Sequence, residues 1–244
     1  MSVKSRLREW ITEMTDLKIL GIDTSGKTAS VALYDGERIL GEITYITKLT
    51  HSQIILPLVK ELLSRLETEL CNVDCIAVSE GPGSYTGLRI GVAAVKGMCF
   101  DGKTKCCGIS TLESIANNLG VFEGVAAVVM HARPNVAYFG AYRCENGGVS
   151  AVFEDKVCGY GEISEYISGL EGKVILAGDI CEKIKEELFS NLENVAVAPP
   201  SLKLQRASSL CELAAKRADK WTSADELNAR YLQETKAEKD RRFS

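Results

Sequence analysis

A short polar turn, Asp23-Thr24-Ser25-Gly26, follows the apolar run at residues 17–22 and contains the first groups in this sequence that could do chemistry. A turn of this kind, at the end of a strand, can offer backbone amides and hydroxyls to nucleotide phosphates, with its carboxylate close to a metal ion. The same residues also suit an Asx-type turn that simply ends the strand. The sequence leaves both interpretations open.

The segment from Gly81 to Gly91, GPGSYTGLRIG, contains four glycines where a strand is expected to give way to a helix. Glycine permits close backbone approach, and a helix N-terminus can bind an anion, but neither a Walker loop nor a dinucleotide fingerprint is present. A packing role is favoured, because small residues recur along one helix face and would let a second helix approach closely. The residues of this face are Gly87, Gly91, Ala94 and Met98. The second helix could be the one beginning at Ser52, one from another subunit, or both.

The helix expected after Ser52 is apolar on more than one side. Its apolar residues form two adjacent rows, Ile54, Leu58 and Leu62 in the first and Ile55, Val59, Leu63 and Leu66 in the second. Such a helix is usually sandwiched between layers, and an oligomer interface is the alternative. Ser52 suits the N-cap, and Pro57 should bend the helix or shift its start.

Histidine is scarce, since only His51 and His131 occur. Neither has a His, Asp or Glu three or four residues away, so a helical pair of zinc or iron ligands cannot form. The sequence also lacks a Gly-x-Ser-x-Gly nucleophile elbow. We therefore expect no catalytic residue, no metal site and no resident cofactor.

The elements that must position these residues occur twice in the same order. The first set comprises strands at 17–22, 28–34 and 38–47, a helix from Ser52, a strand at 75–79, a helix at 88–100 and a strand at 105–109. After a helix at 111–119, the second set comprises strands at 125–130, 136–144 and 149–157, a helix at 163–167, a strand at 173–177 and a helix at 182–189. Two β-β-β-α-β-α units predict an α/β protein with the duplicated ribonuclease-H-like, actin-like ATPase superfold in two subdomains.

The domain organisation follows from this repeat. We assign residues 1–17 to an N-terminal extension, 18–109 to the first subdomain, 110–235 to the second, and 236–244 to a mobile tail. The extension carries apolar residues at helical spacing, and residues 204–221 and 224–234 also appear helical. The C-terminal helix could pack back on the first subdomain.

Composition narrows the class of protein. With 29 basic and 33 acidic residues among 244, the formal net charge is -4, which argues against autonomous nucleic-acid binding. Nine cysteines without C-x-x-C spacing fit a reducing compartment better than a disulfide framework or a zinc site. The sequence shows neither a bilayer-spanning stretch nor a signal core, so we expect a cytoplasmic protein without membrane attachment.

Several of these motifs, in matching order and spacing, resemble the TsaB/YeaZ family over roughly residue 18 to the end of the chain. The motifs are Ile22-Asp23-Thr24-Ser25, Ala29-Ser30-Val31-Ala32-Leu33, His51-Ser52, Leu56-Pro57, the run from Gly81 to Gly91, and Gly108-Ile109-Ser110-Thr111-Leu112-Glu113. The glycine run is the most specific of them. Gln53, Tyr85 and His131 depart from the Glu, Phe and acidic residue that the family usually carries.

The resemblance implies a non-catalytic subunit of the bacterial machinery that makes threonylcarbamoyladenosine in tRNA. In the related transferase TsaD, two histidines that hold iron or zinc lie on the helix after the strand corresponding to 105–109. This chain has Ser110-Thr111-Leu112-Glu113-Ser114 there. Such a subunit binds and activates TsaD, works with the ATPase TsaE, self-associates when alone, and meets tRNA only through the complex.

By the same resemblance, the two helices of the first subdomain form the partner interface, and the turn at Asp23, Thr24 and Ser25 is a vestigial phosphate loop. The implied interface residues are Ile54, Leu58, Leu62, Gly87, Gly91, Ala94, Val95 and Met98. The alternative is an independent ATP-dependent phosphotransferase of the actin-like superfold. Ala177-Gly178-Asp179 is the one faint candidate for the nucleotide contacts that such an enzyme needs in its second half.

Overall fold

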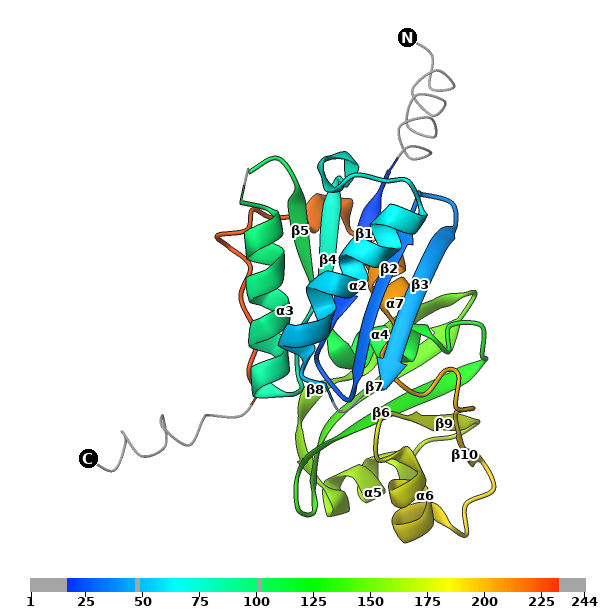
Figure 1. The fold of residues 1–244 in the computed structure, drawn as a ribbon. Helices are drawn as coiled ribbons and strands as arrows, with labels where there is room; N and C mark the ends of the chain where they lie inside the picture. Colours follow the sequence, from blue (N-terminus) through cyan, green and yellow to red (C-terminus); the bar gives the residue numbers. More distant parts are fainter. Residues whose placement is uncertain (1–16, 47–48, 101, 233–244) are drawn as a thin grey trace, which may run out of the picture. The chain divides into compact units, whose positions relative to one another are not determined.

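A computed structural model describes residues 17–46, 49–100 and 102–232 (Figure 1). The expectations for the N-terminal extension before Leu17 and for the tail at 236–244 lie outside the described residues. The chain divides into two compact units, each containing one five-stranded sheet. Of the described residues, unit 1 contains 17–80, 86–109 and 205–228, and unit 2 contains 81–85, 110–204 and 229–232. We call residues 205–228 the return segment.

Unit 1 has a sheet in the order β3-β2-β1-β4-β5, in which β1 pairs antiparallel with β2 and parallel with β4. Its elements are β1 (Ile19–Asp23), β2 (Thr28–Tyr34), β3 (Ile39–Ile46), α2 (His51–Arg65), β4 (Cys75–Gly81), α3 (Tyr85–Met98), β5 (Lys105–Ser110) and α7 (Ala207–Ala215), with 3-10 turns at Leu70–Asn72 and Ala218–Lys220. Helices α2 and α3 cover one face of the sheet and α7 covers the other (Figure 1). The β-branched and apolar residues of β1 and β2 are buried between these layers.

Unit 2 has a sheet in the order β10-β9-β6-β7-β8. Its elements are α4 (Thr111–Asn117), β6 (Gly124–Arg133), β7 (Val136–Glu145), β8 (Gly148–Gly159), α5 (Tyr160–Ser168), β9 (Val174–Ala177), α6 (Cys181–Phe189) and β10 (Val195–Val197). Alternate residues of β6 enter different cores. Val125, Ala127 and Val129 pack with α5 and α6, and Ala126, Val128 and Met130 pack with α4.

The order β-β-β-α-β-α occurs in both units, so the predicted α/β class and duplicated actin-like superfold are confirmed. The predicted helix at 204–221 is too long, because α7 ends at Ala215. The predicted helix at 224–234 is wrong over its described part, because residues 224–232 are irregular. The reason is long-range, because Thr222 and Cys106 exchange two backbone hydrogen bonds of 2.8 and 3.0 Å, and this bridge takes the chain out of helical geometry.

Glu42 on β3 holds the start of α7 against the sheet. Its side chain is only 11% exposed and accepts hydrogen bonds from Arg206 Nε at 2.9 Å and from Ser208 N and Oγ at 2.9 and 2.8 Å. A carboxylate at a helix N-terminus also interacts favourably with the helix dipole. Ser30 Oγ accepts from Ala207 N at 3.0 Å, so β2 and β3 both bind the return segment.

We predict that Glu42→Ala lowers the free energy of unfolding by about 2–4 kcal/mol, because Arg206 and the donors of Ser208 lose their common acceptor. Urea denaturation followed by circular dichroism measures this. Glu61→Ala is the control: Glu61 pairs with Arg65 at 3.0 Å on the exposed side of α2 and should contribute less than about 0.5 kcal/mol. Equal losses in the two variants would contradict the assignment.

Candidate functional site

Asp23 ends β1 with no exposed surface. Its Oδ1 accepts hydrogen bonds from Ser25 N at 2.9 Å and Ser25 Oγ at 2.7 Å, and Ser79 Oγ donates to its Oδ2. Burial raises the pKa of Asp23, while the hydrogen bonds from Ser79 and Ser25 act in the opposite direction. The bond from Ser25 N to the Asp23 side chain has the geometry of an Asx-type turn.

The rest of the turn also contacts unit 1. Thr24 Oγ1 donates to the carbonyl oxygen of Gly87 on α3 at 2.7 Å. The amide of Gln205 lies against Gly26, where a Cβ would be 2.1 Å from Gln205 Nε2. His51 Nε2 lies 2.9 Å from the carbonyl oxygen of Gly26. The turn therefore contacts α2 and α3 through its polar groups and packs closely on the return segment.

The structure separates the eight residues expected at the partner interface into two groups. Five are buried within unit 1, and the other three are partly exposed on α2 and α3. The buried residues are Leu58, Leu62, Gly87, Gly91 and Val95, and the partly exposed ones are Ile54, Ala94 and Met98.

We expected Gly91 to contact a second helix, but its neighbours are Thr24 and Val78. A Cβ there would lie 2.5 Å from Thr24 Oγ1 and 3.3 Å from Val78 Cγ2. The glycine is therefore explained by close packing of α3 on the turn and on β4 of its own unit. Gly91 faces the sheet because α3 must bury its Leu88, Val92 and Val95 row.

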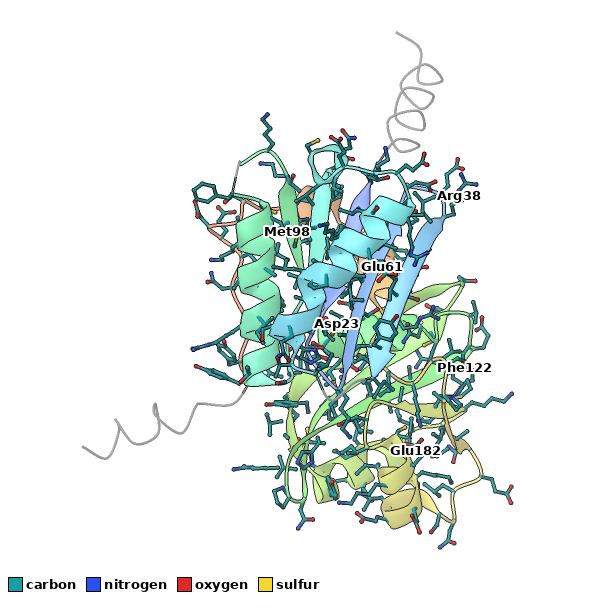
Figure 2. All side chains as sticks on the ribbon, viewed as in Figure 1. Asp23, Arg38, Glu61, Met98, Phe122 and Glu182 are labelled. Carbon is teal, nitrogen blue, oxygen red and sulfur yellow. The ribbon has the colours of Figure 1, made fainter. Side chains whose placement is uncertain are left out.

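The outer face of α3 carries another row of small and apolar residues, of which the sequence interpretation named only Ala94 and Met98. It consists of Ile90, Ala93, Ala94, Gly97 and Met98, all partly or fully exposed. We call it the α3 outer face. Met98 lies on it, and Glu61 marks the neighbouring helix α2 (Figure 2). The spacing of three and four residues was readable from the sequence, but two such rows exist on one helix and only packing decides which one is buried.

A second polar cluster lies in unit 2. Asp155 on β8 accepts hydrogen bonds from Ser110 Oγ, which caps α4, and from the hydroxyl of Tyr142 on β7. Burial raises the pKa of Asp155, and these two hydrogen bonds oppose the shift. Gly140 makes room for the carboxylate, because a Cβ there would be 2.4 Å from Asp155 Oδ1. The cluster fastens α4 to β7 and β8.

The segment Ala177-Gly178-Asp179 is also engaged within unit 2. Gly178 N donates to Lys203 O at 2.7 Å, and Asp179 Oδ1 accepts from His131 N at 2.8 Å. In the described part of the chain, no group of three His, Cys, Asp or Glu side chains is placed to hold a metal ion. Among the described helices, none has the length and apolarity needed to cross a membrane.

Comparison with known proteins decides the family. The model for TsaD, tRNA N6-adenosine threonylcarbamoyltransferase, matches residues 38–239. The tRNA threonylcarbamoyladenosine biosynthesis protein TsaB of Haemophilus influenzae is 32% identical over 186 residues, which are 74% of this chain and 70% of that protein. The chain belongs to the TsaB/YeaZ family. The resemblance seen in the sequence motifs is thereby confirmed.

Two further similarities agree with membership in the TsaB/YeaZ family. The TsaB protein of Bacillus subtilis is 36% identical over 141 residues, which are 57% of this chain. The chain spans 61% of the length of that relative. A crystal structure of a Pseudomonas aeruginosa protein, described as similar to peptidase YEAZ, superposes with a TM-score of 0.78 at 26% identity, covering 89% of this chain and all of that one.

We predict that Asp23→Asn folds and removes one component of the pH dependence of stability. The asparagine keeps the acceptor for Ser25 without a charge to bury. Because the folded pKa of Asp23 is raised above 3.8, the native state holds this proton more tightly than the unfolded state. The stability of the wild type relative to Asp23→Asn should therefore fall as pH rises from about 4 through the raised pKa. Urea unfolding at pH 4 to 7 measures it, and parallel profiles would contradict it.

Proposed function

We propose that this chain is a non-catalytic subunit in tRNA threonylcarbamoyladenosine biosynthesis, which binds the TsaD transferase and activates it to modify the adenosine next to the anticodon. The observation that carries the proposal is family membership, since the Haemophilus influenzae and Bacillus subtilis relatives are named for this biosynthesis. TsaE, the ATPase, would be a further partner. The protein would meet tRNA through the complex, in the cytoplasm.

The α3 outer face supports a docking role. Ala93, Ala94 and Gly97 have no bulk, so a partner helix could approach the α3 backbone closely, and Ile90 and Met98 would add apolar area at its two ends. Ile54 on α2 is partly exposed and belongs to the same layer of unit 1. An interface of standard size, about 1,600 Å² in total, would extend over both helices. The same surface would serve self-association when TsaD is absent.

We infer that this subunit is not catalytic because it lacks the histidines that would hold an iron or zinc ion. The chain has two histidines, and the segment Ser110-Thr111-Leu112-Glu113-Ser114 has none where the resemblance places the metal ligands of TsaD. Ser110 there instead caps α4 and binds Asp155. Serine and threonine hydroxyls are poor substitutes for imidazole at an iron or zinc site.

The alternative is an independent ATP-dependent phosphotransferase. Asp23, Ser25 and Thr24 are less suited to it, because their side chains already bond to one another, to Ser79 and to Gly87. Calorimetry with ATP and magnesium separates the two functions. Micromolar binding with turnover by the isolated chain would favour the phosphotransferase.

We predict that Gly97→Leu weakens binding to TsaD at least tenfold while leaving the chain folded. A Cβ at Gly97 would meet no atom within 4 Å, so the leucine projects from the α3 outer face and blocks close helix approach. Size-exclusion chromatography and calorimetry with TsaD from the same organism measure the loss.

Gly161→Leu is the matched control. Gly161 lies on α5 of unit 2, and a Cβ there is equally free of neighbours. This variant should bind TsaD as the wild type does. Full binding by Gly97→Leu, or an equal loss in both variants, would remove the α3 outer face from the interface.

A further inference from the structure

The Asp23–Gly26 turn has side chains that point in different directions with different partners. The carboxyl group of Asp23 accepts hydrogen bonds from Ser25 and Ser79, so its partners lie inside unit 1. Gly26 is covered by Gln205, which is 1% exposed and whose Oε1 lies 3.4 Å from the hydroxyl of Thr28. Contacts within unit 1 thereby fix the turn against the sheet and the return segment, and no external ligand is needed to hold it.

Thr24 is the residue of this fixed turn that contacts α3. It is 1% exposed, and its hydroxyl donates at 2.7 Å to Gly87 O in the first turn of the helix. One turn later, Gly91 leaves open the space that this hydroxyl requires, because a Cβ would come within 2.5 Å of Thr24 Oγ1. The carbonyl group of Gly87 and the space left by the missing side chain of Gly91 therefore accommodate the hydroxyl group of Thr24.

The contact of Thr24 with Gly87 and Gly91 sets the position of the α3 outer face. Gly87 and Gly91 lie on the buried side of α3, and Ile90, Ala93, Ala94 and Gly97 lie on the other side of the same turns. A rigid helix transmits a shift of its buried side to its exposed side. A small displacement at Thr24 thus moves the groups that a partner helix would contact.

We infer that Thr24 is a positioning residue for partner docking: its hydroxyl anchors α3 so that the outer face stands where TsaD can bind it. The inference rests on the proposed function and adds to it a residue that has no contact with the partner. The turn that resembles a phosphate loop acts in this chain as the support of the docking helix.

The test compares three variants of the full-length chain, with the affinity for TsaD measured by calorimetry. Thr24→Val keeps the shape and removes the hydroxyl, so α3 spends less time in the binding-competent position and Kd should rise about fivefold. Thr24→Ser keeps the hydroxyl and should bind within about twofold of the wild type. Thr104→Val replaces another buried threonine of unit 1, outside the Asp23–Gly26 turn, and should also stay within about twofold.

The outcomes are distinguishable from failure of the proposed function. If the wild type does not bind TsaD, the proposed function itself fails. If the wild type binds and Thr24→Val binds equally well, or if Thr24→Ser is as weak as Thr24→Val, or if Thr104→Val is equally impaired, the positioning role is overturned. Should Thr24→Val not fold, Gly91→Ala displaces the same hydroxyl from the helix side, and unchanged affinity in that variant overturns the inference.

Discussion

The structure of unit 1 depends on supplying hydrogen-bond donors to the buried carboxyl group of Asp23. An unpaired buried carboxylate is costly, so the residue can occupy this position only with donors aimed at it. Ser25 and Ser79 supply them, one from the same turn and one from the parallel neighbour β4. The turn is consequently compact, which brings Thr24 against α3 and Gly26 against the return segment. One local requirement thus organises contacts with both faces of the sheet.

Membership in the TsaB/YeaZ family and the match to the TsaD model illustrate how one scaffold can carry different sites. Where the sequence resemblance predicts the metal ligands of TsaD, this chain has Ser110, whose hydroxyl caps α4 and donates to Asp155. The side chains of the Asp23–Gly26 turn likewise form hydrogen bonds within unit 1. On the surface of unit 1, the α3 outer face is a row of small and apolar residues, of the kind that lets another helix approach closely.

Much of the fold could be predicted from local signals. Apolar runs located the strands, and the repeated element order gave the superfold. The interactions that decide the ends of elements were not readable, because they join distant residues. Glu42 with Ser208 spans 166 positions, and the Thr222 bridge to Cys106 spans 116 and ends helical structure where the sequence favoured it. The three-residue strand β10 was too short to give a pattern.

The candidate site shows the same limit. The importance of the turn at Asp23 and of the glycines on α3 was visible in the sequence, but their relation to each other was not. Gly91 is small because of Thr24, 67 positions earlier in the chain, and a single sequence has no means of pairing them. The same absence of packing information placed buried and partly exposed residues of α3 together in the predicted interface and left Ile90, Ala93 and Gly97 out of it.

The most direct test of this account is hydrogen–deuterium exchange of the chain alone and in complex with TsaD. Docking through unit 1 predicts that amide exchange slows in α3 (Tyr85–Met98) and α2 (His51–Arg65), with the strands and helices of unit 2 unchanged. Protection confined to unit 2, or exchange in α3 that TsaD does not alter, would contradict the claim that this helix is the docking element.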